Sequence, residues 1–177
     1  TAGEKVSHPV IATAREDRLR RRVVTVLNAA GFDETITFSF LSREECGHFG
    51  IPEPVAVDSA IRRSDNALRP TLIPSLLKAA RYNQDAGNDD LALFEIAAVY
   101  RPSDDRLPEE HTEIALLTTG GPRRLKGAVE LLCRRICPGC TLRSVPAPLP
   151  GFAPERSAGL TLEGAEAGCF GAVSSAV

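Results

Sequence analysis

Residues 68–101 read LRPTLIPSLLKAARYNQDAGNDDLALFEIAAVYR, and this stretch decides the fold because it joins a helix to a buried strand. Pro70 and Pro74 come early, where a helix does not need their missing amide donors. Apolar residues then recur at helical spacing and predict a helix to about Asn83. Residues 85–90 have turn chemistry. Residues 91–100 are almost continuously apolar, which is typical of a strand covered on both faces.

A second helix and strand precede this stretch. Thr13 and Glu16 form a candidate capping box, in which each side chain satisfies a free amide of the first helical turn. The apolar stripe behind them is Leu19, Val23, Val26, Leu27 and Ala30. Gly31 follows where a left-handed cap ends a helix. Residues 35–40 alternate between apolar and polar, which predicts a half-buried strand.

Shorter elements complete the chain. Ser42 and Glu45 form a second candidate capping box, for a short helix ending near Gly50. The pattern predicts an extended piece at residues 55–57 and a helix at residues 122–137. Strands are predicted around residues 113–117, 158–162 and 169–173. We therefore expect an α+β fold, with a mainly antiparallel sheet flanked by helices.

The composition suits one ordinary globular domain. The 177 residues are 43% hydrophobic and 25% charged, and the net charge of −2 gives no global basic field for nucleic acid. No apolar run approaches the ~20 residues that span a bilayer. We expect an irregular lead-in at residues 1–12 and one domain at residues 13–177, as a piece of a longer chain. Five cysteines, an odd number, favour a reducing cytoplasm over a disulfide framework.

Several stretches resemble class II aminoacyl-tRNA synthetases. Residues 28–40 (NAAGFDETITFSF) resemble the region around motif 1, and residues 68–77 (LRPTLIPSLL) resemble the segment before motif 2. The words LFEI and VY within residues 93–100 resemble the first strand of motif 2. Residues 125–130 (LKGAVE) and 154–158 (PERSA) are similar to later words of one family, the phenylalanyl-tRNA synthetase beta subunit.

This resemblance implies a non-catalytic, synthetase-like domain of a phenylalanine–tRNA ligase. In that family the beta subunit's domain packs on the catalytic alpha subunit of a heterotetramer and supports ATP-dependent charging of tRNA with phenylalanine. ATP and Mg²⁺ would serve the holoenzyme, and we expect no cofactor or metal in this domain. The resemblance places the interface on the motif 1-like region, at Phe32, Ile36, Phe38 and Phe40. The alternative is that these residues fill the domain's own core, as alternating apolar residues usually do.

The residues argue against catalysis by this domain alone. Arg101 matches the motif 2 arginine that grips a phosphate, but Ser103 stands where a glutamate is expected. Pro102 and Pro108 predict an irregular loop instead of a regular hairpin. No glycine-rich motif that ends in Glu-Arg follows in residues 102–177. A strand-end arginine in solvent is the alternative for Arg101. Two rival functions stay open: a divergent enzyme that forms an acyl-adenylate, and a free-standing synthetase-like regulatory or binding protein.

Three further groups of residues suggest specific roles. Arg69 and Glu95 are predicted to form a buried, hydrogen-bonded pair, because a lone carboxylate among apolar residues would be costly. Cys133, Cys137 and Cys140 hold only one closely spaced pair, so we interpret them as incidental thiols, with no metal. The arginines at residues 18–22 could touch tRNA phosphates, but they are interpreted as the solvated face of a helix.

Overall fold

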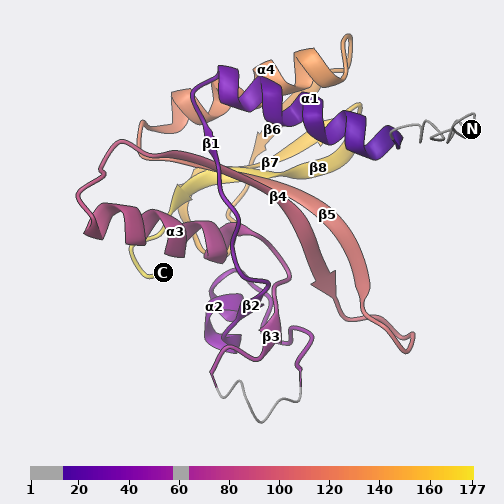
Figure 1. Cartoon of the computed structure of the whole chain (residues 1–177), viewed down its shortest axis with the longest axis vertical. Coiled ribbons are helices and arrows are strands. Elements are labelled where there is room, and N and C mark those ends of the chain that lie inside the picture. Colours follow the sequence, from indigo (N-terminus) through magenta and orange to yellow (C-terminus); the bar gives the residue numbers. More distant parts are fainter. Residues whose placement is uncertain (1–13, 58–63) are drawn as a thin grey trace, which may run out of the picture.

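The computed structural model describes residues 14–57 and 64–177, which form an α+β fold (Figure 1). The expected fold class is confirmed. The elements in chain order are α1 (Arg15–Ala29), β1 (Asp33–Glu34), β2 (Phe40–Leu41), α2 (Arg43–His48), β3 (Ala67–Leu68), α3 (Ile73–Asp85), β4 (Ala92–Arg101), β5 (Glu109–Thr118), α4 (Pro122–Ile136), β6 (Leu142–Pro146), β7 (Phe152–Leu162) and β8 (Ala165–Val173). The predicted lead-in at residues 1–12 lies outside the described residues.

The central sheet has the strand order β1-β4-β5. The short strand β1 pairs in parallel with β4, with Asp33 opposite Leu93. Strands β4 and β5 pair antiparallel without interruption, from Ala92 opposite Thr118 to Arg101 opposite Glu109. The prediction that no regular hairpin follows Arg101 was therefore wrong. The prolines lie in the connecting loop, outside the paired residues, so they remove no ladder hydrogen bond.

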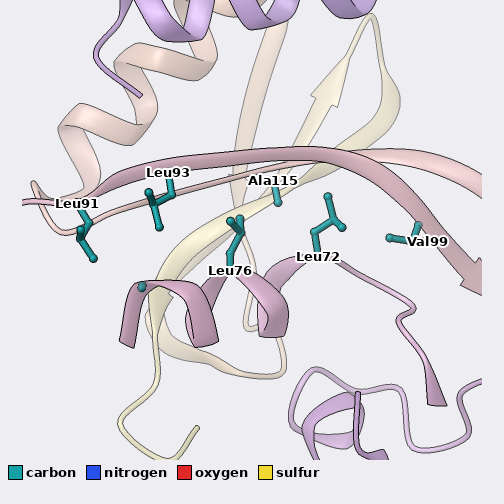
Figure 2. Packing of buried hydrophobic residues seen from close by; sticks show 7 residues of the cluster. Leu72, Leu76, Leu91, Leu93, Val99 and Ala115 are labelled. Carbon is teal, nitrogen blue, oxygen red and sulfur yellow. The ribbon is translucent and has the colours of Figure 1, made fainter. Parts of the chain in front are cut away.

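Helices cover both faces of this sheet (Figure 1). Helix α3 lies on one face, where Leu72 and Leu76 point toward Leu91, Leu93 and Ala115 (Figure 2). Helices α1 and α4 lie on the other face. Their buried side chains pack against alternate residues of the same strand, in a cluster of Leu27, Phe32, Ala92, Phe94, Ile96 and Ala128. The apolar run of β4 is thus buried on both sides, as its composition predicts.

A second sheet has the strand order β6-β7-β8, and α4 packs beside it. The tight turn between β7 and β8 uses Glu163 and Gly164, both with positive φ. Strand β6, which pairs antiparallel with β7, was not predicted. Its residues are mostly exposed, so the hydrophobic alternation that would indicate a strand is weak.

A small unit of α2, β2 and β3 contacts the second sheet. Phe49 and Phe152 meet edge to face, with ring centroids 6.0 Å apart. Gly151 has a φ of +78°, and a Cβ at this position would lie 2.5 Å from the Phe49 ring. Only glycine therefore fits the close approach of this loop to Phe49.

The two predicted capping boxes had different outcomes. In α2, the Ser42 hydroxyl accepts from the Glu45 amide, and the Glu45 carboxylate accepts from the Ser42 amide, so this box is confirmed. In α1, Ala14 is the cap residue and makes no side-chain hydrogen bond, while Thr13 lies outside the described residues. Gly31 has a φ of +78° just after α1, as predicted for a left-handed cap.

The predicted strand at residues 35–40 was wrong. Only residues 33–34 and 40–41 belong to strands, and residues 35–39 form an irregular extended segment between them. The apolar residues of this segment do not face the core. The polar residue Thr37 faces inward instead, because a buried ion pair supplies its hydrogen-bonding partners.

Candidate functional site

A buried ion pair lies beneath the extended segment. The Nη1 atom of Arg69 lies 2.9 Å from Oε1 of Glu95, and the side chains are only 3% and 2% exposed. Arg69 comes just before α3, and Glu95 lies in the middle of β4. The structure thus brings together the two residues that the sequence analysis paired.

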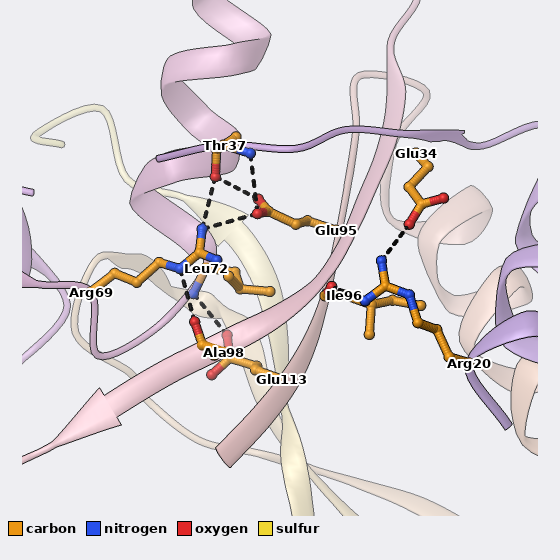
Figure 3. Close-up of polar contacts among 9 residues, drawn as sticks. All are labelled: Arg20, Glu34, Thr37, Arg69, Leu72, Glu95, Ile96, Ala98 and Glu113. Carbon is orange, nitrogen blue, oxygen red and sulfur yellow. Dashed lines mark hydrogen bonds and ion pairs between the residues drawn. The ribbon is translucent and has the colours of Figure 1, made fainter. Parts of the chain in front are cut away.

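Thr37 completes this buried network (Figure 3). Its backbone amide and its hydroxyl both donate to the Glu95 carboxylate, at 3.2 and 2.6 Å. The same hydroxyl accepts from Arg69 Nη1 at 2.9 Å, while Arg69 Nε donates to the Ala98 carbonyl at 2.9 Å. Both charges are therefore hydrogen-bonded as well as paired, which offsets the cost of removing them from water.

The network holds the middle of the extended segment, and backbone hydrogen bonds hold its two ends. The Thr35 amide donates to the Phe94 carbonyl at 2.8 Å, and the Arg69 amide donates to the Ser39 carbonyl at 2.9 Å. Because Thr37 faces the ion pair, its neighbours Ile36 and Phe38 face solvent. Ile36 is 89% exposed and Phe38 is 82% exposed. The result is a fixed backbone that presents two large apolar side chains to water.

The four residues predicted for an interface therefore divide. Phe32 is buried beneath α1 and α4, and the Arg124 guanidinium stacks over its ring at 5.8 Å. Phe40 is half-buried and pairs with Leu68 in the small β2–β3 sheet. Ile36 and Phe38 alone are free to contact another protein. The core alternative thus applies to Phe32, and largely to Phe40.

Three polar residues that support the site were not predicted. Thr37 is one of them, and its place between two apolar residues was the available signal. Glu113 of β5 accepts from the Thr71 hydroxyl at 2.8 Å and from the Leu72 amide at 2.9 Å, which fixes the start of α3. Arg20 of α1 donates to the Ile96 carbonyl and to Glu34, both at 3.0 Å (Figure 3). Arg20 thus reaches the sheet with its guanidinium although its side chain is 48% exposed, and Arg18, Arg21 and Arg22 are exposed as well.

Arg101, the candidate phosphate ligand, is exposed at the end of β4. The β4–β5 register places Glu109 directly opposite it. The adjoining loop carries Asp104 and Asp105, and the Asp105 amide donates to the Ser103 hydroxyl at 3.1 Å. The same loop also carries the exposed Arg106, so Arg101 lies in solvent among charges of both signs.

The structure places the sulfur atoms of Cys137 and Cys140 in contact, which the interpretation as incidental thiols did not anticipate. They flank the turn between α4 and β6. Cys46 is a buried thiol, Cys133 a half-buried one and Cys169 an exposed one. Within residues 14–57 and 64–177, no group of three or more His, Cys, Asp or Glu side chains could hold a metal ion. No helix in the same part of the chain is both long and apolar enough to cross a membrane.

Solved structures share this fold. Two structures of pyrrolysyl-tRNA synthetase from Desulfitobacterium hafniense superpose with TM-scores of 0.66 and 0.58, at 18% sequence identity in both cases. The first comparison covers 86% of this chain and 56% of that one, and the second covers 81% and 54%. These comparisons establish the class II synthetase fold.

Sequence relatives are more specific. The chain is 30% identical over 177 residues to the phenylalanine–tRNA ligase beta subunit of Listeria monocytogenes, covering 90% of this chain and 22% of the relative. It is 29% identical over 171 residues to that of Bacillus cereus, covering 86% and 21%. The chain thus spans about a fifth of the length of these relatives. Residues 5–177 match the family described as "Phenylalanyl tRNA synthetase beta chain CLM domain", and the chain belongs to this family.

Proposed function

We propose that this chain is a non-catalytic scaffold domain of phenylalanine–tRNA ligase, which packs on the catalytic alpha subunit. On this proposal, ATP, Mg²⁺ and phenylalanine react on the alpha subunit, and tRNA binds to the assembled heterotetramer in the cytoplasm. The domain's own contribution is an interface. The single observation that carries the proposal is the exposure of Ile36 and Phe38 on a fixed backbone.

The geometry around these two residues favours a protein partner. Large apolar side chains in water are unfavourable unless another surface covers them, at ~25 cal/mol per Å² of buried apolar area. The network of Arg69, Glu95 and Thr37 holds the segment before binding. Less conformational entropy is therefore lost on association, which increases the affinity that two apolar residues can supply.

The two rival functions have less support. An enzyme that forms an acyl-adenylate needs cations held where the phosphates lie, and Arg101 is exposed at a strand end opposite Glu109. Helices also cover both faces of the β4–β5 sheet (Figure 1). This leaves less of the sheet surface open to a substrate. A free-standing regulator would have to bind a different protein through the same apolar segment, and the relatives named as ligase beta subunits favour the scaffold instead.

Association with the alpha subunit tests the proposal. The chain would be mixed with the phenylalanyl alpha subunit of the same organism, and the complex measured by size exclusion with light scattering and by titration calorimetry. We expect Phe38→Asp to weaken binding at least tenfold, because a central apolar anchor is typically worth ~2 kcal/mol. Leu107→Asp is the matched control, since Leu107 is 74% exposed at the tip of the β4–β5 hairpin, away from the segment.

Each outcome has a distinct meaning. Binding by the wild type and by Leu107→Asp, with a weak Phe38→Asp variant, would support the scaffold role and its location. Equal weakening by both variants would contradict the location. If the wild type is folded by circular dichroism but does not bind the alpha subunit, the scaffold role is wrong for this domain. In that case a regulator that binds another protein becomes the better hypothesis.

A further inference from the structure

The turn between α4 and β6 holds two cysteines at bonding distance. It reads Cys137-Pro138-Gly139-Cys140, and the Cys140 amide donates to the Cys137 carbonyl at 3.1 Å. Gly139 has a φ of +89° and follows a proline, which is the arrangement of a type II turn. The two Cα atoms lie 5.6 Å apart, within the range that a disulfide requires. The Pro-Gly turn therefore presents the two sulfurs to each other without help from the rest of the fold.

We propose that Cys137 and Cys140 are a reversible dithiol–disulfide pair that controls the mobility of the joint between α4 and β6. A structural disulfide stabilises a protein mainly when it closes a long loop of the unfolded chain. This one encloses only Pro138 and Gly139, so it contributes little to global stability and acts locally, on the last turn of α4 and the turn that follows it. Its loss leaves the domain folded, so the pair can change its oxidation state without unfolding the protein.

Exposure and competition both suit this role. Cys137 and Cys140 are half-buried, so a small reagent can reach them, whereas Cys46 is buried in the α2 unit. Cys133 is one helical turn earlier, and burial raises the pKa of its thiol. The thiolate is the nucleophile in exchange, so the raised pKa slows the reaction of Cys133.

The joint connects two parts of the fold. The Arg135 carbonyl, in the last turn of α4, accepts from Arg22 of α1 at 2.8 Å. On the other side, the Thr141 amide donates to the Glu163 carboxylate, and Leu142 pairs with Leu162 of β7. The turn thus joins the helical layer of the first sheet to the second sheet. Reduction releases this cross-link and increases the local mobility of the last turn of α4.

The exchange needs a partner of the disulfide or thiol class. One thiolate of the pair attacks a low-molecular-weight disulfide, forming a mixed disulfide and releasing one thiolate. The second thiolate of the pair then attacks the protein sulfur of the mixed disulfide and displaces the other small thiolate. In total, two protein thiols lose two electrons and two protons, and one small disulfide becomes two small thiols. A dithiol reductant reverses both steps.

A redox titration of the 177-residue chain tests the assignment. Samples equilibrated in buffers of oxidised and reduced glutathione would be quenched with acid, alkylated and mapped by peptide mass spectrometry. We expect Cys137 and Cys140 to lose alkylation together, in one two-electron transition that millimolar dithiothreitol reverses. The matched control Cys133→Ser keeps the transition, and Cys140→Ser abolishes it. A transition that disappears in Cys133→Ser, or a pair that does not oxidise in any buffer, would overturn the proposal.

Limited proteolysis tests the effect on the joint. Arg134 and Arg135 are exposed trypsin sites in the last turn of α4, and Arg123 near its start is an exposed internal control. We expect several-fold faster cleavage after Arg134 and Arg135 in the reduced protein, with equal cleavage after Arg123 in both forms. Cys140→Ser should be cleaved at the fast rate in every buffer. Equal rates in the oxidised and reduced wild type would refute the proposed control of mobility.

Discussion

Replacement of Arg69 by methionine removes one half of the buried ion pair while keeping most of the side-chain volume. Glu95 then stays in an almost fully buried site with only the two Thr37 donors. The Ala98 carbonyl also loses its hydrogen bond from Arg69. Breaking a buried pair on one side typically costs about 3–5 kcal/mol, because an uncompensated charge remains in the interior. We expect Arg69→Met to lower the free energy of unfolding by about this amount.

Urea denaturation followed by circular dichroism measures this cost, and a double-mutant cycle isolates its cause. Glu95→Met removes the orphaned carboxylate, so the double variant should cost less than the sum of the single variants, by about 1–3 kcal/mol. Lys126→Met is the control, since Lys126 forms an exposed pair with Glu130 at 3.8 Å and should change stability by less than about 0.5 kcal/mol. Single costs that simply add, or an Arg69→Met cost below about 1 kcal/mol, would refute the reasoning.

Three other predictions concern stability. Burial opposes the charged form of Glu45, but hydrogen bonds from Lys78 and Ser42 together lower its pKa below the ordinary 4.5. The stability that ionised Glu45 contributes is therefore present above pH 4.5 and lost as pH falls through the lowered pKa. Glu45→Gln should make the free energy of unfolding depend less on pH in this acid range. Gly151→Ala should cost about 2 kcal/mol or more, because its Cβ would meet the Phe49 ring. Leu76→Ala should cost about 2–5 kcal/mol by leaving a cavity beneath α3.

Each of these predictions has its own check. Acid titration of wild type and Glu45→Gln by circular dichroism would contradict the first one if the two curves stay parallel below pH 4.5. Gly87→Ala is the control for Gly151→Ala, since Gly87 also has a positive φ but open space around its Cβ position, so only about 1 kcal/mol of backbone strain is expected. Equal costs at the two glycines would remove the steric argument. A Leu76→Ala cost below about 1 kcal/mol in urea would show that the core collapses around the gap.

The sequence by itself determined the main elements and their class. Helical spacing and the apolar run of residues 91–100 identified α3 and β4, because burial of an element's face requires a matching hydrophobic period. The same local chemistry located the Ser42–Glu45 capping box. The sequence motifs within residues 68–100 indicated the family. The energetic cost of a lone buried carboxylate predicted that Glu95 pairs with Arg69.

Only the tertiary structure decided which way residues 35–39 face. Alternation left open whether Ile36 and Phe38 fill the core or form an interface, and the buried charges of Arg69 and Glu95 attract Thr37 inward and turn its neighbours outward. These charges come from segments about 30 and 60 residues away along the chain, so no local pattern contains their effect. The candidate interface therefore exists because satisfying a buried ion pair outweighs burying two apolar side chains.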